Sequence, residues 1–208
     1  MAGAHITTGL ISSTIAILRA TFENYNIVKG DKGLREAFHG AGRGLLLVED
    51  ALQTAKIQLD GRDPAGDPGT AMGPLEACNV KAKLSESIFK DVAQGPEALR
   101  LQRYKTAVRR EGKENTAEAL VTGMMNDACD LANNSAIEAA MKDQVKGLRD
   151  AIDELSTMEP SVPNDPLGIS FSNSGSGRQF NNTEGTQYNT TDNGKQFFGN
   201  FTGAVTFN

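Results

Sequence analysis

Residues 137–155 read IEAAMKDQVKGLRDAIDEL and carry the clearest structural signal in the chain. Apolar residues recur every three or four positions with charged residues between them, the pattern of an amphipathic helix with one buried face. The predicted buried stripe comprises Ile137, Met141, Val145, Leu148, Ile152 and Leu155. Asn134 or Ser135 is a suitable N-cap for this helix. Because such a face needs partners, the stretch predicts a helical bundle.

Earlier segments repeat this spacing. A first helix is expected from about Thr7 to Val28, with a stripe of Ile6, Leu10, Thr14, Leu18, Phe22 and Tyr25. A second covers Leu34 to Leu59, and its Gly40, Gly42 and Gly44 predict a kink or break because glycine weakens a helix. A third runs from about Pro74, in its first turn, to Val92. A basic fourth segment and a helix capped by Thr116 follow. The fold expected is an all-α, antiparallel helical bundle.

The sequence offers no pattern of catalytic or metal-binding residues. It has no Gly-X4-Gly-Lys-Ser/Thr loop, so any NTPase partner is expected to be a separate protein. His5 and His39 lack a nearby nucleophile, and the acidic turn around Asp63 has Ala71 where a calcium loop needs glutamate. We therefore expect no enzyme activity, no catalytic residue, no cofactor and no metal, although a small enzyme with an unrecognised site stays a weaker alternative.

Charge and cysteine usage restrict the partners and the compartment. The formal net charge of −5 argues against nucleic-acid binding, which needs a basic surface. Cys78 and Cys129 show no disulfide or zinc spacing, and no secretory leader pattern opens the sequence. A cytoplasmic protein with reduced thiols is expected.

Composition changes near Pro160, where charged helical sequence gives way to a segment rich in Asn, Gly, Ser and Thr. We predict a bundle over 1–157, a Pro-rich linker over 158–170 and a separate tail over 171–208. The tail holds seven of the twelve aromatic residues of the chain, although polar disordered segments are usually poor in aromatics. A flexible low-complexity tail is the alternative.

The tail also repeats a unit of the form Gly-X-Gln-aromatic. The glycines are eight and nine residues apart, and the repeated residues are Gly177, Gln179 and Phe180, then Gly185, Gln187 and Tyr188, then Gly194, Gln196 and Phe197. Stacked copies would place glutamine over glutamine and ring over ring, which stabilises cross-β assemblies. The repeat predicts an amyloid motif, disordered in the single chain and β-structured on assembly with copies of itself.

Several stretches resemble a known family. Residues 9–17 (GLISSTIAI), 75–78 (LEAC) and 103–108 (RYKTAV) resemble the fungal HeLo-like/SesA domain found at the N-terminus of NACHT-type receptors. Residues 173–183 (NSGSGRQFNNT) resemble the RHIM-like amyloid signalling motifs, of PP/SesB type, that accompany this domain. The resemblance implies a bundle similar to the four-helix domain of the necroptosis executioner.

The resemblance also implies a function in fungal programmed cell death, incompatibility and innate immunity. A cognate NACHT/NLR receptor would template the prion-like tail into amyloid, and the clustered bundles would leave the cytoplasm for the plasma membrane and permeabilise it. A non-lytic adaptor or inhibitor that uses the same tail is the alternative.

The first helix is the element that would reach the membrane. Its stretch from Ile6 to Leu18 has no formal charge, yet thirteen residues are fewer than the roughly 20 that span a bilayer. The membrane-targeting residues predicted are Ile6, Leu10, Ile11, Ile15, Ile17 and Leu18. They spread around much of the helix, so a single packing face is not expected to cover them all.

Overall fold

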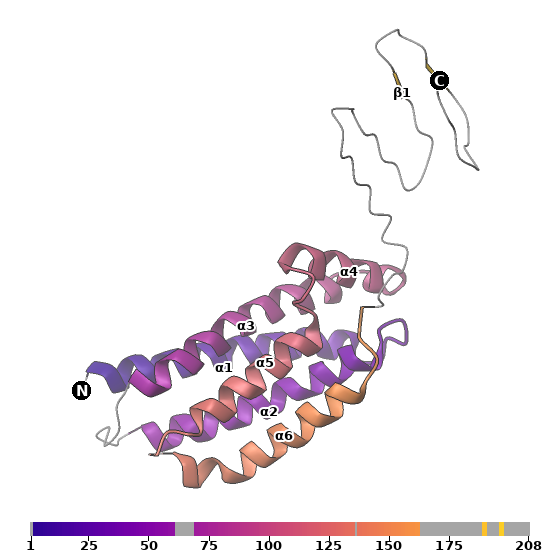
Figure 1. The fold of residues 1–208 in the computed structure, drawn as a ribbon. Helices are drawn as coiled ribbons and strands as arrows, with labels where there is room; N and C mark the ends of the chain where they lie inside the picture. Colours follow the sequence, from indigo (N-terminus) through magenta and orange to yellow (C-terminus); the bar gives the residue numbers. More distant parts are fainter. Residues whose placement is uncertain (1, 61–68, 136, 163–188, 191–195, 198–208) are drawn as a thin grey trace, which may run out of the picture. The chain divides into compact units, whose positions relative to one another are not determined.

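The computed structural model describes residues 2–60, 69–135, 137–162, 189–190 and 196–197. The chain divides into two compact units, Met1–Asn164 and Asp165–Asn208. The first unit is built from helices, which confirms the predicted all-α fold (Figure 1). Its long helices are α1 (Ala2–Val28), α2 (Glu36–Leu59), α3 (Gly69–Ala93), α4 (Arg100–Glu111), α5 (Ala117–Leu131) and α6 (Lys142–Thr157). Short 3-10 turns, η1 (Glu97–Leu99) and η2 (Glu138–Met141), precede α4 and α6.

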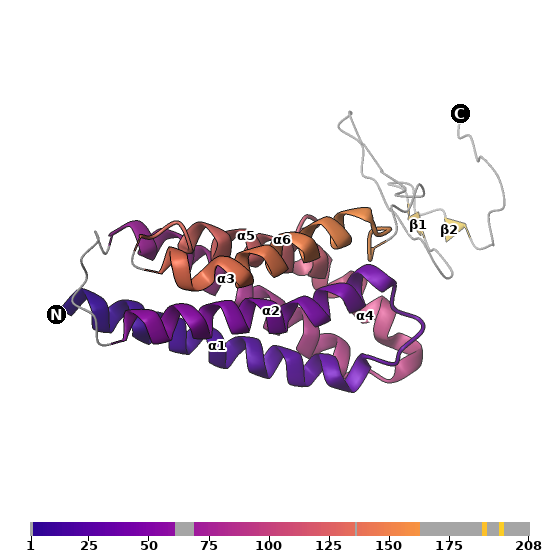
Figure 2. The same cartoon turned by 90° about the horizontal axis from the view of Figure 1, so that it is seen from below.

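Four of the helices form a closed ring in the order α1, α3, α5, α2, each packed against its two neighbours. The sixth, α6, packs on α2 and α5, whereas α4 lies against α3 at one end of the bundle (Figures 1 and 2). Successive long helices α1, α2 and α3 alternate in direction, so the neighbours α1 and α3 run parallel (Figure 2). Two contacts with the same sequence offset, Thr7 to Met72 and Thr14 to Asn79, fix that parallel register.

Of the kink or break predicted near Gly40, the break is not present, because α2 runs as one helix from Glu36 to Leu59. Its glycines serve close packing instead. A Cβ at Gly42 would collide with the ring of Tyr25, so the aromatic side chain of α1 lies directly on the α2 backbone. Burial against α1 and α5 supplies more stability than the weak helix propensity of glycine removes.

Three helix starts also differ from the prediction. Helix α1 begins at Ala2, five residues before the expected Thr7. Helix α3 begins at Gly69, so Pro74 lies in the second turn, where it removes one backbone hydrogen bond and its ring crowds the carbonyl four residues earlier. Helix α6 begins at Lys142 after η2, and neither Asn134 nor Ser135 is its N-cap. The carbonyl of Asn134 instead accepts the amides of Ile137 and Glu138, both at 3.0 Å, so a backbone turn replaces the predicted cap.

Other local predictions are confirmed. The Thr116 hydroxyl accepts the amide of Ala119 at 3.3 Å and caps α5. The stripe predicted from residues 137–155 is buried or half-buried throughout.

Aromatic side chains fill the core at the end of the bundle where α4 lies. The Phe38 ring centroid lies 4.7 Å from that of Phe89 and 4.9 Å from that of Tyr104. Tyr25 meets Phe89 edge-on at 6.1 Å. Such tilted and edge-to-face pairs are favourable, so this end has a well-defined packing arrangement.

In the second unit the structure describes two short strands, β1 (Asn189–Thr190) and β2 (Gln196–Phe197). They pair antiparallel, with Asn189 opposite Phe197 and Thr190 opposite Gln196.

Candidate functional site

Helix α1 holds the six residues predicted to reach a membrane, and the bundle covers most of them. Ile11, Ile15 and Leu18 are buried in the core, and Leu10 and Ile17 are half-buried against it. Ile6 is 61% exposed. The expectation that one packing face cannot cover all six is therefore confirmed, but only Ile6 is left largely in solvent.

The buried face of α1 follows a seven-residue repeat that the predicted stripe missed. Seven buried positions follow alternating steps of four and three, with Ile15 buried beside them: Thr7, Ile11, Thr14, Leu18, Thr21, Tyr25 and Val28. The predicted stripe took four steps of four residues, and each such step rotates about 40° past a full turn. It therefore drifted around the helix and included the exposed Ile6. The regular spacing of the threonines was the signal that could have located the true face.

The buried threonines are satisfied by hydrogen bonds. The Thr14 hydroxyl donates to the Leu10 carbonyl at 2.9 Å and accepts from the Asn79 amide of α3 at 2.9 Å. The Thr21 hydroxyl donates to the Ile17 carbonyl at 2.7 Å. The interface between α1 and α3 is therefore partly polar, with its polar groups paired.

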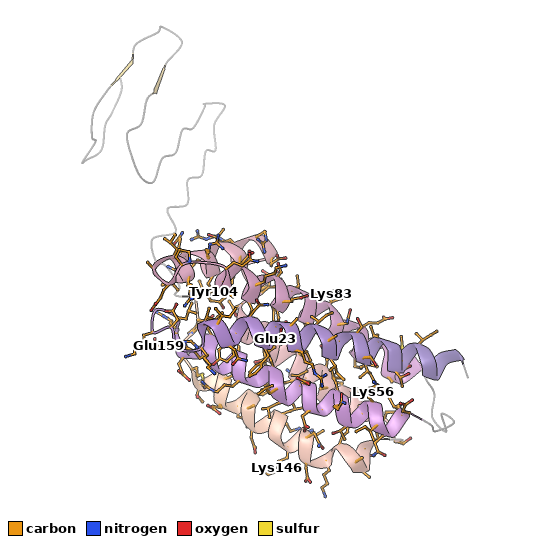
Figure 3. The ribbon with its side chains drawn as sticks, turned by 180° about the vertical axis from the view of Figure 1, so that it is seen from behind. Glu23, Lys56, Lys83, Tyr104, Lys146 and Glu159 are labelled. Atoms are coloured by element: carbon orange, nitrogen blue, oxygen red, sulfur yellow. The ribbon has the colours of Figure 1, made fainter. Side chains whose placement is uncertain are left out.

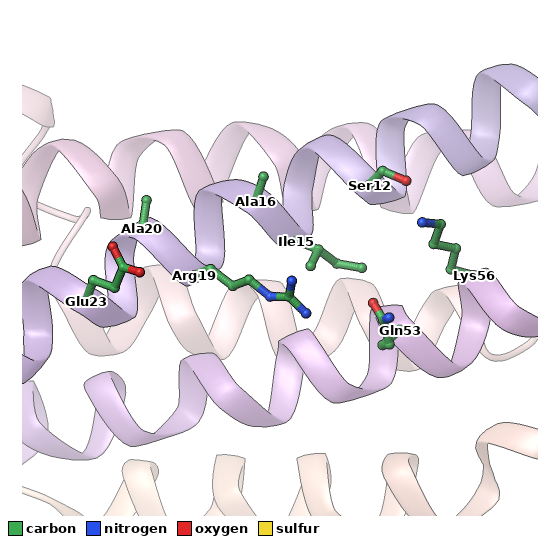
Figure 4. Close-up of a pocket in the computed structure, with 8 residues that line it drawn as sticks. All are labelled: Ser12, Ile15, Ala16, Arg19, Ala20, Glu23, Gln53 and Lys56. Atoms are coloured by element: carbon green, nitrogen blue, oxygen red, sulfur yellow. The ribbon is translucent and has the colours of Figure 1, made fainter.

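The solvent face of α1 is uncharged before Arg19. Small side chains, Gly9, Ser13 and Ala16, are exposed there. Between α1 and α2 lies a groove of about 390 Å³, and Figure 4 shows the eight residues that line it: Ser12, Ile15, Ala16, Arg19, Ala20, Glu23, Gln53 and Lys56. Beside it the Arg19 Nε donates to Glu49 Oε1 at 2.7 Å and joins the two helices.

The segment that leads to the tail is fixed to the bundle at Ser161, which is fully buried. Its backbone N–H donates to Glu118 Oε1 at 3.0 Å, and its Oγ lies 2.5 Å from Glu118 Oε2 and 2.5 Å from the Tyr104 hydroxyl. Tyr104 Oη also accepts the amide of Ala117 at 2.9 Å. Burial, reinforced by the Glu118 charge, raises the pKa of Tyr104 well above its ordinary value, so the phenol stays protonated.

Arg35, the residue before α2, also contacts this segment. Its Nη1 donates to the Pro160 carbonyl at 3.0 Å and lies 3.7 Å from the Glu159 carboxylate. Residues 158–162 belong to the predicted linker, and no local pattern in the sequence indicates these contacts. Ser161 lies 57 residues from Tyr104 and 43 from Glu118, so only the folded bundle brings them together.

The start of α1 and the Ser161 site lie at opposite ends of the bundle (Figure 2). Tyr104 and Glu159 mark the Ser161 end in Figure 3, and Lys56 lies toward the other end. Helix α1 has 27 residues, which correspond to a length of about 40 Å.

Most of the predicted amyloid residues lie outside the described residues: Gly177, Gln179, Phe180, Gly185, Gln187, Tyr188 and Gly194. Gln196 and Phe197 form β2. The Gln-over-Gln stacking is thus still a prediction.

Both cysteines are free thiols, as expected. Burial raises the pKa of the Cys78 thiol to about 12 and also raises that of Cys129, where nearby Arg149 opposes the effect. Within the described ranges, no cluster of His, Cys, Asp and Glu could hold a metal ion. Nor does any helix in them combine the length and apolarity needed to cross a membrane.

Comparisons with known proteins show that both parts of the chain match models of domains found on NACHT NTPases. Residues 11–131, more than half of the chain, match the model of the SesA family, described as the N-terminal domain on NACHT and P-loop NTPases. Residues 168–208 match the model described as the sigma domain on NACHT NTPases, and this match does not support the PP/SesB type suggested by sequence resemblance. No curated protein and no solved structure matched the chain.

Proposed function

This chain belongs to the SesA family, and from that premise we propose that it is an effector of regulated cell death controlled by a NACHT-type receptor. Both family models that match are described as domains on NACHT NTPases, which supports a receptor of this class as the partner. The receptor templates the tail into a cross-β assembly through the repeated Gly-X-Gln-aromatic units. The clustered bundles then act on the plasma membrane through α1.

The observation that carries this proposal is the distribution of charge along α1. From its start to Leu18 the helix has no Asp, Glu, Lys or Arg, on its buried face or on its solvent face. An ordinary surface helix places charged residues on the solvent side. Here Gly9, Ser13 and Ala16 take those positions, so the first half of α1 can enter an apolar phase without desolvating a charge.

The geometry of the bundle suits this role. The Ser161 site anchors the chain at one end, and α1 begins at the other (Figure 2). Copies held through their tails would gather many α1 helices on one assembly. Tethering raises the effective concentration of the bundles, so individually weak contacts with lipid become strong together.

In this proposal the protein acts by assembly and without catalysis, cofactor or metal. It is cytoplasmic at rest and moves to the plasma membrane after activation. Its partners are further copies of itself, the receptor and lipid, and nucleic acid is not among them.

The decisive experiment is dye leakage from liposomes of plasma-membrane composition. The full chain is added alone, and then together with preformed fibrils of a peptide covering 168–208. We expect leakage only in the seeded sample. Fibrils of the peptide alone are the control. If the seeded full chain assembles and the liposomes stay intact, the membrane part of the proposal is wrong.

One observation favours the adaptor or inhibitor as the second candidate. Ile11, Ile15 and Leu18 are core residues, so the bundle uses the apolar face of α1 for its own stability. An adaptor would keep this face packed after assembly. Protection of α1 amides from hydrogen exchange in seeded samples separates the two functions, because the effector must lose that protection and the adaptor must keep it.

A further inference from the structure

We propose that residues Glu159–Val162 form a latch that holds α4 against the bundle, and that pulling this segment out of its site releases α4. The segment, called the strap below, is the last part of the first unit before the tail. The proposal concerns the bundle itself and does not depend on membrane activity.

The hydrogen bonds around Ser161 have only one consistent direction. An ionised Glu118 carboxylate can only accept, so the Ser161 hydroxyl must donate to it. The Ser161 oxygen is then free to accept from the Tyr104 hydroxyl, and Tyr104 in turn accepts the Ala117 N–H. That N–H is in the first turn of α5 and has no partner within its own helix. The strap thus completes a relay that joins α4 to the start of α5.

Helix α4 depends on this relay more than the other long helices do. Among the long helices of the described chain, only α3 has its backbone close to that of α4. The other links of α4 across the bundle are made by side chains: the Tyr104 ring on Phe38, the Tyr104 hydroxyl to the strap and α5, and Arg100 Nη1 to the buried Asp31 Oδ2 at 3.2 Å. Removing the Ser161 hydroxyl breaks the bond between Tyr104 and the strap, so Tyr104 keeps only its ring contact with Phe38 and its bond to the Ala117 N–H.

The strap is held in a way that allows release. Ser161 is its only fully buried residue, Val162 is half-buried, and the Glu159 side chain is 88% exposed. The strap is therefore attached to the bundle mainly by hydrogen bonds and less by a broad apolar surface. Hydrogen bonds are directional and break when the groups move a short distance apart. The second unit begins at Asp165, three residues after Val162. The strap is therefore the part of the first unit that the chain joins directly to the tail.

Hydrogen–deuterium exchange on the full chain tests the latch. Ser161→Ala removes the hydroxyl that links Tyr104 to Glu118, and we expect amide exchange to become at least tenfold faster across residues 100–111 and in the first turn of α5. Helices α1 and α3 should keep parent-like exchange. The matched control is Ser156→Ala, because the Ser156 hydroxyl bonds only the Asp153 carbonyl on the exposed side of α6. It should exchange like the parent throughout.

Tyr104→Phe is the second variant, which keeps the ring packed on Phe38 and removes only the hydroxyl. It should reproduce the local effect on α4. Parent-like exchange of α4 in both variants would overturn the proposal. A uniform increase across all helices would overturn it equally, since it would show a general loss of stability without a latch.

A final measurement asks whether the tail operates the latch. The parent chain is followed by hydrogen exchange before and after seeding with fibrils of the peptide 168–208. If assembly pulls on the strap, α4 loses protection on seeding, and Ser161→Ala shows no further loss. If seeded and unseeded α4 exchange alike while the tail is in fibrils, the tail does not open the latch. No leakage is measured, so this result stands apart from the membrane proposal.

Discussion

A charge at Gly9 separates the proposed membrane role of α1 from its role in the bundle. Gly9 is exposed, and a Cβ placed there meets no atom within 4 Å. It also lies near the middle of the uncharged stretch that ends at Leu18. Gly9→Glu therefore adds a carboxylate that water can reach in the folded bundle but that lipid must exclude. A charge at Ile11 would instead be buried in the core and would unfold the protein.

Gly9→Glu should have opposite effects on the stability of the folded bundle and on insertion of α1 into a bilayer. In the bundle, glutamate is a better helix former than glycine by about 0.5 kcal/mol, and surface changes rarely exceed about 0.5 kcal/mol, so stability should hold or rise slightly. In a bilayer, a central acidic residue costs about 2.5–3.5 kcal/mol. At 1.4 kcal/mol per factor of ten, insertion of one helix becomes roughly 60-fold to 300-fold weaker.

The matched control is Gly9→Ala, which fills the same space and strengthens the helix by about 0.8–1.0 kcal/mol without adding charge. Urea unfolding should show both variants at least as stable as the parent. Seeded liposome leakage should fall at least tenfold for Gly9→Glu and stay near the parent level for Gly9→Ala. If a folded Gly9→Glu protein assembles and still permeabilises liposomes like the parent, α1 is not the membrane element.

Three further predictions concern the tail, the core and the thiols. A peptide covering 168–208 should form fibrils with a strand spacing of about 4.7–4.8 Å by fibre diffraction, and a peptide that stays monomeric at high concentration would contradict the repeat. Gly42→Ala should lower the free energy of unfolding by about 1–3 kcal/mol because its Cβ collides with the Tyr25 ring, whereas a stabilised variant in urea titration would refute that packing. A thiol reagent at pH 8 should label Cys129 before Cys78, since Cys78 is buried with a pKa of about 12 and its thiolate is scarce; faster labelling of Cys78 would show that α3 opens.

The helices were predictable because their signal is local. Residues 137–155 alternate apolar and charged positions with helical period, and that pattern directly gives the buried face of α6. Thr116 was recognisable as a cap for the same reason. The glycines of α2 misled the prediction because their role is tertiary, and nothing near Gly42 in the sequence reveals that Tyr25 lies against it.

The strap site could not be predicted. It brings together Tyr104, Glu118 and Ser161 from three separate segments, and none of them has an unusual local context. Proline at 160 suggested a linker, since proline commonly follows the end of a helix. In the tail, by contrast, the sequence is the main source of inference, because the repeat lies almost wholly outside the described residues.

The threonines of α1 reconcile a buried helix with one that later meets lipid. Thr14 and Thr21 donate to carbonyls four residues earlier in the same helix, so their hydroxyl protons keep a partner wherever α1 goes. If α1 leaves the bundle, the hydrogen bond between Thr14 and Asn79 breaks on the α3 side, where the Asn79 amide loses its acceptor and water can replace it. Aliphatic residues at these positions would bury more apolar surface and hold α1 more firmly. At positions 14 and 21, threonine therefore weakens the packing of α1 without leaving an unsatisfied hydroxyl proton on the helix that would enter the membrane.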